Sequence, residues 1–145
     1  LKSKGQDGKI VVLGRDDVFN RRILETIKIN YLVSAENIEF HNRDSLKQRD
    51  SGLNHVLAKI AKEKKIGIVF DVSQLMGVSK DSKKEKALVL ARMMQNVDVC
   101  RRAKCDLKLA SFAENKKQLI SEEQIKAFGF SIGMSSQQVR ESRVF

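Results

Sequence analysis

The sequence predicts an α/β domain with a parallel sheet and helices packed outside it. Short, continuous apolar runs alternate along the chain with segments of helical periodicity. Such runs are typical of strands that are buried on both faces, as in parallel sheets. The chain has 145 residues, of which 41% are hydrophobic, and this is enough for one domain with a core. We therefore expect residues 1–145 to form a single domain.

The first three elements follow from apolar patterns near the N-terminus. A strand is expected at residues 10–13, I-V-V-L, and we expect it to be buried on both faces. A helix is expected over 18–27, where apolar residues recur at helical spacing, with Asp16 or Asp17 as its N-cap. Residues 31–33, Y-L-V, are the second predicted strand.

The middle of the chain begins with a long polar stretch. Residues 34–50 are predicted as a loop, with a short strand at 38–40 as the alternative, and loops of this length are usually functional. Ser51 is the expected N-cap of the next helix. Its apolar stripe has the spacing i, i+3, i+4, i+7 and i+8, and consists of Leu53, Val56, Leu57, Ile60 and Ala61. The strand at 66–70 ends next to Asp71.

The second half carries the longest predicted helix. A Lys-rich loop at 77–86 leads into this helix, which is expected over 84–104 with an apolar seam and a basic flank that includes Arg92. A strand at 107–110 follows. Basic residues in the last turn of the long helix suit the negative end of the helix dipole.

Two helices are expected near the C-terminus. Ser121 opens a capping box, S-E-E-Q, and the helix that follows is expected to end near Gly129 or Gly133. Ser135 or Ser136 is the expected N-cap of a last short helix that ends near residue 141. The order of strands and helices therefore favours a parallel sheet throughout.

The charge of the chain restricts its partners. Twenty-eight Lys and Arg against 18 Asp and Glu give a formal net charge of +10. This excess predicts attraction to a polyanion, either nucleic acid or an anionic membrane surface, with a merely solvated basic surface as the alternative. We expect no membrane span, because apolar runs are too short. Cys100 and Cys105 fit neither a zinc pattern nor a disulfide framework, so we expect reduced thiols in a cytosolic protein.

Catalytic patterns are not evident. His41 and His55 lack metal-ligand spacing, and Asp71 adds one carboxylate without completing a set of three. Ser51 and His55 are four residues apart, but capping explains Ser51. Neither a Gly-rich phosphate loop nor an aromatic stacking surface is visible.

Cations and amides at loops and helix starts remain as the candidate binding groups. Such a distributed set suits the recognition of phosphates and shape in folded RNA. The candidate RNA-binding residues are Asn20, Arg21, Arg22, Arg49, Asn54, His55, Lys83 and Lys84.

Residues 50–61, D-S-G-L-N-H-V-L-A-K-I-A, resemble the pattern of one family. In that pattern a basic pair precedes D-S-G-[LI]-[ND]-H, and an apolar-striped helix and a buried strand follow. The family is the thirty-kilodalton protein subunit of archaeal and eukaryotic ribonuclease P, also called component three. Residues 11–24, 107–115 and 128–139 resemble further segments of it, so the resemblance covers nearly the whole chain.

The resemblance implies a TIM-like (β/α) barrel with parallel strands and outer helices. The family's first βα units have no counterpart before Leu1, so we expect a barrel that is truncated at the N-terminus. Two local departures accompany this one. Gln48 stands where the family has the first residue of its basic pair, and only Arg49 remains. The loop at 34–48 is also longer than is usual in the family.

The resemblance also implies a function. Family members bind the ribonuclease P RNA together with the smaller component-two subunit, as a heterodimer or heterotetramer. The RNA, with its own magnesium ions, removes the 5′ leader from precursor tRNA. The chain is then a non-catalytic, cytoplasmic subunit that meets precursor tRNA through the holoenzyme. No cofactor, metal or membrane is implied for the protein itself. Arg21, Arg49, Asn54 and His55 are the RNA contacts that the resemblance favours.

Two other functions stay open at this point. A small metal-dependent hydrolase of a related barrel family would carry its site at the same strand ends, but needs ligands that this sequence does not show. A stoichiometric transition metal would favour it. A protein–protein scaffold would leave an apolar face of the helix at 84–104 exposed.

Overall fold

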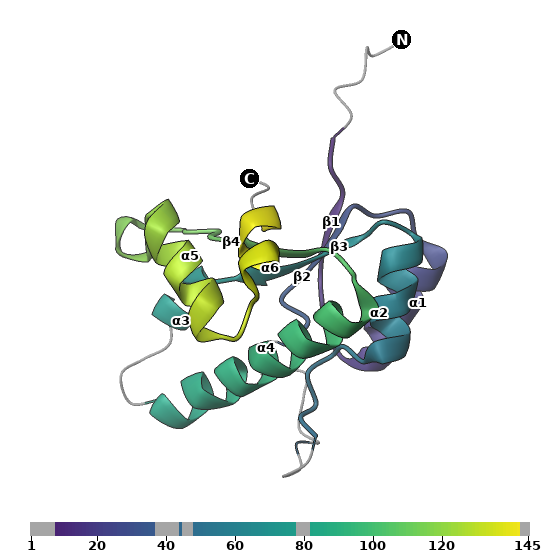
Figure 1. Ribbon diagram of the computed structural model, residues 1–145, viewed down its shortest axis with the longest axis horizontal. Helices are drawn as coiled ribbons and strands as arrows, with labels where there is room; N and C mark the ends of the chain where they lie inside the picture. Colours follow the sequence, from purple (N-terminus) through teal and green to yellow (C-terminus); the bar gives the residue numbers. More distant parts are fainter. Residues whose placement is uncertain (1–7, 37–43, 45–47, 78–81, 143–145) are drawn as a thin grey trace.

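The computed structural model describes residues 8–36, 44, 48–77 and 82–142 (Figure 1). Within them, four strands form one parallel sheet in the order β1-β2-β3-β4. The strands are β1 Val11–Leu13, β2 Tyr31–Val33, β3 Gly67–Asp71 and β4 Leu107–Ala110. In register, Val12 lies opposite Leu32, and Leu32 lies opposite Ile68. The predicted parallel α/β fold is confirmed. The sheet of the described residues is open, and closure into a barrel stays a prediction.

Six α-helices and one 3-10 helix surround this sheet in the described residues. They are α1 Asp17–Thr26, α2 His55–Glu63, α3 Ser73–Gly77, α4 Lys83–Ala103, the 3-10 helix η2 Lys116–Gln118, α5 Glu122–Ser131 and α6 Ser136–Glu141. In Figure 1, α4 crosses below the sheet, α1 and α2 lie to its right, and α5 lies to its left. Helices α2 and α4 pack against each other.

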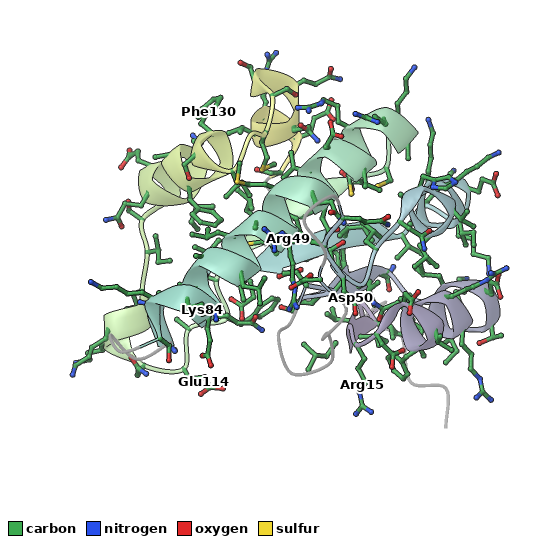
Figure 2. All side chains as sticks on the ribbon, turned by 90° about the horizontal axis from the view of Figure 1, so that it is seen from below. Arg15, Arg49, Asp50, Lys84, Glu114 and Phe130 are labelled. Atoms are coloured by element: carbon green, nitrogen blue, oxygen red, sulfur yellow. The ribbon has the colours of Figure 1, made fainter. Side chains whose placement is uncertain are left out.

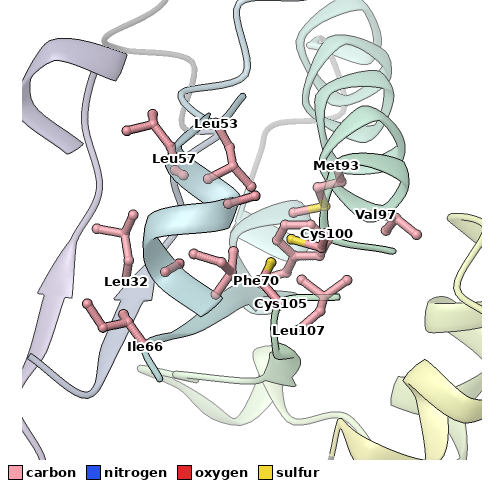
Figure 3. Close-up of a cluster of buried hydrophobic side chains, with 14 of the residues drawn as sticks. Leu32, Leu53, Leu57, Ile66, Phe70, Met93, Val97, Cys100, Cys105 and Leu107 are labelled. Carbon is pink, nitrogen blue, oxygen red and sulfur yellow. The ribbon is translucent and has the colours of Figure 1, made fainter. Parts of the chain in front are cut away.

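The main core lies between the sheet and helices α1, α2 and α4. Leu32, Ile68 and Phe70 from the strands are fully buried there, and Met93 and Val97 of α4 pack against them (Figure 3). A smaller cluster on the other face of the sheet consists of Val33, Val69 and Ala110. Because both faces of β3 are covered, the whole strand is buried, as its continuous apolar sequence predicts.

The predicted caps explain where several helices begin. The Phe19 backbone N–H donates to the Asp16 carboxylate over 2.8 Å, which confirms Asp16 as the N-cap of α1. Ser121 and Ser135 each form a complete capping box at the start of α5 and α6. These hydrogen bonds satisfy backbone N–H groups that a helix start leaves without partners.

Three predictions are wrong: they concern the N-cap of α2, the exposure of Arg92 and the burial of the first strand. Asn54, not Ser51, caps α2, because Gly52 turns the chain between them and the Asn54 side-chain oxygen, Oδ1, accepts from the Leu57 N–H. Arg92 lies inside the protein instead of on a basic flank, since it is 0% exposed. The first strand is buried on one face only, as described below.

The structure also contains two short helices that the sequence did not indicate. Helix α3 begins two residues after the end of β3, and the short η2 helix begins six residues after the end of β4. Both are too short to show a helical periodicity in the sequence. The alternative strand at 38–40 lies outside the described residues.

β1 is an edge strand of the described sheet. Val12 packs toward the main core, whereas Val11 is 41% and Leu13 53% exposed. The alternation follows from the pleat of a strand, in which successive side chains point to opposite faces. A continuous apolar run predicts two covered faces, but at this edge the described residues cover only one of them.

Candidate nucleic-acid interface

Asn20 joins two segments that meet at the start of α1. Its side-chain amide donates to the carbonyl oxygens of Arg15, over 2.9 Å, and Gly52, over 2.8 Å. Its side-chain oxygen accepts from the Arg15 backbone N–H over 2.8 Å. Because Asn20 is 0% exposed, it cannot reach a ligand outside the protein. This corrects the prediction of Asn20 as an RNA contact and makes it a positioning residue.

The D-S-G-L-N-H segment owes its shape to Gly52. Its φ is +70°, in the left-handed region that glycine adopts without strain. A Cβ atom at this position would lie 2.1 Å from the Ala35 carbonyl oxygen. The backbone at Gly52 therefore lies so close to the residues after β2 that only a glycine fits there. The turn leaves Asn54 free to cap α2 and places His55 in its first turn.

Gln95 of α4 fixes the backbone of Arg49. The Arg49 N–H donates to the Gln95 side-chain oxygen, and the Gln95 amide donates back to the Arg49 carbonyl oxygen, both over 2.8 Å. The same amide donates to the Ser51 hydroxyl over 2.9 Å. Asn96, the next residue, donates to the Ser51 carbonyl oxygen over 3.1 Å. Figure 2 shows Arg49 beside the middle of α4.

Replacing Gln95 by alanine should free the Arg49 segment. We expect the free energy of unfolding to fall by about 2 kcal/mol, because part-buried backbone groups lose their partners. The Arg49 amide should also exchange with solvent faster, which hydrogen exchange measures directly. Gln137→Ala, at an exposed position of α6, is the control and should change stability by only a few tenths of a kcal/mol. Unchanged exchange of the Arg49 amide would disprove that Gln95 holds the Arg49 backbone in place.

A groove of about 420 Å³ separates α1 from α2. Arg21 and Arg22 line it from α1, and Asn54 and Val56 line it from the start of α2. The Arg21 side chain is 60% exposed and pairs with Glu25 over 2.9 Å. An exposed pair of this kind contributes little to stability, so the guanidinium can exchange its carboxylate for another anion. Three predicted site residues, Arg21, Arg22 and Asn54, therefore meet in one place.

A second groove, of about 580 Å³, separates α2 from the end of α4. His55, Lys59, Lys62 and Glu63 line it from α2, and Arg102 is its cation from α4. The Arg102 side chain is 80% exposed and pairs with Asp98 over 3.0 Å. Of these residues only His55 was predicted as part of a binding site. The i, i+4, i+7 spacing of His55, Lys59 and Lys62 could have indicated this stripe, because it repeats on one side of a helix.

Lys83 and Lys84 lie apart from both grooves. They are exposed in the first turn of α4, and Figure 2 places Lys84 near that end of the helix. Arg102 follows Lys84 by eighteen residues, which corresponds to about 27 Å along a helix. The predicted cations therefore do not all lie together, because Lys83 and Lys84 are at the opposite end of α4 from Arg102.

Arg92 of α4 forms a largely buried ion pair. The Arg92 guanidinium donates to the Asp44 carboxylate over 2.8 Å, and the two side chains are 0% and 15% exposed. Partial burial raises the pKa of Asp44, but the hydrogen bond and charge of Arg92 outweigh it and hold this pKa below its usual value. The pair connects α4 to the segment before α2. It could not be predicted, since the residues are 48 positions apart.

Glu36 is a buried carboxyl group just after β2. It is 0% exposed, and neither of its carboxyl oxygens makes a hydrogen bond of ordinary geometry among the described residues. Removal from water raises the pKa of Glu36 to about 8, and the negative charge of Asp71 adds to this effect. Its own backbone N–H and the Arg92 guanidinium oppose the shift only in part. Glu36 is therefore mostly protonated at neutral pH.

Asp71 holds the ends of β3 and β4 together. Its Oδ1 accepts from the Ser73 N–H over 3.0 Å, from the Ser73 hydroxyl over 2.6 Å and from the Phe112 N–H over 3.2 Å. These bonds occupy one oxygen, Oδ1, of the carboxylate that the sequence offered as a metal ligand. Across the described ranges, no three His, Cys, Asp or Glu side chains are close enough together to hold a metal ion.

The cysteines, the surface of α4 and the apolar character of the helices bear on the predictions about thiols, a protein–protein scaffold and a membrane span. Cys100 and Cys105 are buried free thiols, and a hydrogen bond with Cys105, together with burial, raises the pKa of Cys100 well above its usual value. The buried residues of α4 include Val89, Met93 and Val97, while Met94 is exposed. None of the helices in the described part of the chain has the length and apolar character needed to cross a membrane.

The fold is similar to that of a chain in a solved structure, the cryo-EM structure of archaeal ribonuclease P with mature tRNA. The TM-score is 0.72 at 22% sequence identity, over 92% of this chain and 54% of that chain. This chain thus spans about half the length of the one it matches. At this identity the likeness concerns the fold. No family model matches the sequence, and no curated protein is similar to it.

Proposed function

We propose that this chain is a protein subunit of a ribonuclease P ribonucleoprotein and binds the RNA of that complex. The observation that carries the proposal is the likeness in fold, over 92% of the chain, to a chain of archaeal ribonuclease P. The two grooves beside α2 support it, because exposed cations on a shaped surface suit the recognition of RNA phosphates. The groove toward α4 is lined by three cations and one carboxylate, and the groove toward α1 by two cations and two carboxylates.

The specific form of the proposal follows the resemblance of residues 50–61. The chain is component three of the complex, a single domain related to a TIM-like barrel, and works in the cytoplasm. It pairs with the component-two subunit and supports removal of the 5′ leader from precursor tRNA. Cleavage is carried out by the RNA with its magnesium ions, and the protein contributes neither a catalytic residue nor a cofactor.

The proposed RNA contacts are exposed groups, except for Arg49 and Asn54, which are partly exposed. Arg21, Arg22 and Asn54 contact RNA in the groove between α1 and α2, and His55 does so on the other side of α2. Arg49 is a further proposed contact, and its backbone is held by two hydrogen bonds with the Gln95 side chain. Lys83 and Lys84 extend the cationic surface along α4.

Replacing Arg21 and Arg22 by alanine should weaken RNA binding in a salt-dependent way. Each lost phosphate contact should flatten the slope of log K against log salt by about 0.7 to 0.9. The measurement is a filter-binding titration of an archaeal ribonuclease P RNA at a series of salt concentrations. The matched control is Lys116→Ala with Lys117→Ala in η2, which removes two exposed charges away from α1 and α2.

Two outcomes would contradict the proposal. One is an unchanged slope in the Arg21 and Arg22 variant, or an equal change in the control. The other is cleavage of precursor tRNA by the purified chain alone with magnesium, since the proposed subunit has no catalytic role. The mass of the RNA that co-purifies with the full chain provides an independent check.

A further inference from the structure

Helix α2 forms a ridge between the two grooves. Its buried residues are Leu57, Ala58 and Ala61, so one side of the helix is fixed to the core. Val56 lines the groove toward α1, whereas the neighbouring residue His55 lines the groove toward α4. The outer surface of α2 between them is exposed. A ligand that covers this ridge meets both grooves at once.

Cations stand on both sides of the ridge. Arg21 and Arg22 face it from α1, and Lys59, Lys62 and Arg102 line the opposite groove. The carboxylates present are those of Asp17 and Glu25 on the first side and Glu63 on the second. Arg21 and Arg102 are engaged only in exposed ion pairs, which exchange readily for a phosphate.

The dimensions of the ridge suit a double helix better than a single strand. Side chains give a helix a diameter of about 10 to 12 Å, so the two sets of cations are separated by roughly this width. The minor groove of an RNA double helix is wide and shallow, with a phosphate strand on each side of it. A single strand is usually bound by one charged groove with aromatic side chains on which its bases stack. Among the described residues that line these grooves, the imidazole of His55 is the only aromatic ring, and Phe, Tyr and Trp are absent.

We infer that double-helical RNA docks with its minor groove over α2. One phosphate strand lies along Arg21 and Arg22, and the other lies along Lys59, Lys62 and Arg102. This inference rests on the proposed function and adds the kind of RNA that is bound and a second set of contacts. Val56 and His55 lie on the two sides of the exposed surface of α2, and there they face the sugars and base edges of the minor groove.

The test compares an RNA hairpin with a single-stranded RNA of equal length, using the full chain. Three double variants are measured: Arg21→Gln with Arg22→Gln, Lys59→Gln with Lys62→Gln, and the control Lys116→Gln with Lys117→Gln. Glutamine keeps the helix propensity of the exposed sites, and thermal unfolding verifies that each variant is folded. We expect the hairpin to bind more tightly than the single strand.

The salt dependence separates the two grooves. Each of the first two variants should flatten the salt slope for the hairpin by about 1.4 to 1.8, since two phosphate contacts are lost in each. The combined fourfold variant should lose roughly the sum, and the control should retain the original slope.

Four results would overturn the inference. If Lys59→Gln with Lys62→Gln leaves hairpin binding unchanged while the Arg21 and Arg22 variant weakens it, the ridge model fails but RNA binding stands. Equal affinity for the single strand would also exclude the double helix. Equal affinity for poly-glutamate would assign the grooves to an acidic protein segment. If neither RNA binds, the proposed function itself fails.

Discussion

Gly52→Ala is expected to lower the free energy of unfolding by about 3 kcal/mol or more. The left-handed backbone at Gly52 costs an alanine roughly 1 to 2 kcal/mol. In addition, its Cβ would meet the Ala35 carbonyl oxygen at 2.1 Å, and the Gly52 segment cannot move away without breaking its hydrogen bond from Asn20. Crowding of this kind costs a further 1 to 3 kcal/mol or so. Urea unfolding at neutral pH measures the loss.

Gly133→Ala separates the two contributions. Gly133 also has a positive φ, of +92°, but a Cβ there would meet nothing within 4 Å. This control variant should therefore show only the backbone cost, roughly 1 to 2 kcal/mol. If the two variants lost the same stability, close approach at Gly52 would not matter. In that case the glycine of the D-S-G motif would serve the turn alone.

Glu36→Gln is expected to stabilise the protein at pH 8 by roughly 4 kcal/mol. The pKa of Glu36 is raised from 4.5 to about 8 in the folded state. Between these values the unfolded chain releases the proton and the folded protein keeps it. The contribution of Glu36 to the stability of the wild type is therefore most favourable below pH 4.5 and declines as the pH rises to about 8. Glutamine cannot ionise, so the variant lacks this decline.

Unfolding in urea at pH 5 and pH 8 tests this difference. At pH 5 the variant and the wild type should differ little, and at pH 8 the variant should have the higher midpoint. Asp71 and Arg92 are the charged groups that act on Glu36, and both remain in the variant. Glu123→Gln, exposed on α5, is the control and should show no such pH dependence. A gain that is equal at both pH values would contradict the buried, protonated carboxyl.

The fold was largely predictable because its signals are local. Apolar runs and helical periodicity indicate four strands and the longer helices, and Asp16, Ser121 and Ser135 mark helix starts by bonding to residues three positions away. The exposure of β1 was missed for a physical reason. Whether a strand has a neighbour on its outer side depends on strand order, and an apolar run is the same in both cases.

The site was predictable only in part, because its supporting contacts join distant residues. Arg21 and Arg22 precede Asn54 by some thirty residues, yet they share a groove that α1 and α2 form by packing. Arg92 was predicted to lie on the basic flank of a helix, and nothing in the sequence singled out Gln95. Their partners, Arg49 and Asp44, lie 46 and 48 residues away, so no spacing rule could connect them.

The unequal covering of β1 has a practical consequence for the isolated chain. A strand edge with exposed Val11 and Leu13 can add another extended segment by backbone hydrogen bonding. The cationic face of α2 repels a second copy of itself, and added salt weakens that repulsion while it favours apolar contact. Self-association of concentrated samples should therefore begin at β1 and grow with ionic strength, opposite to the salt response of RNA binding.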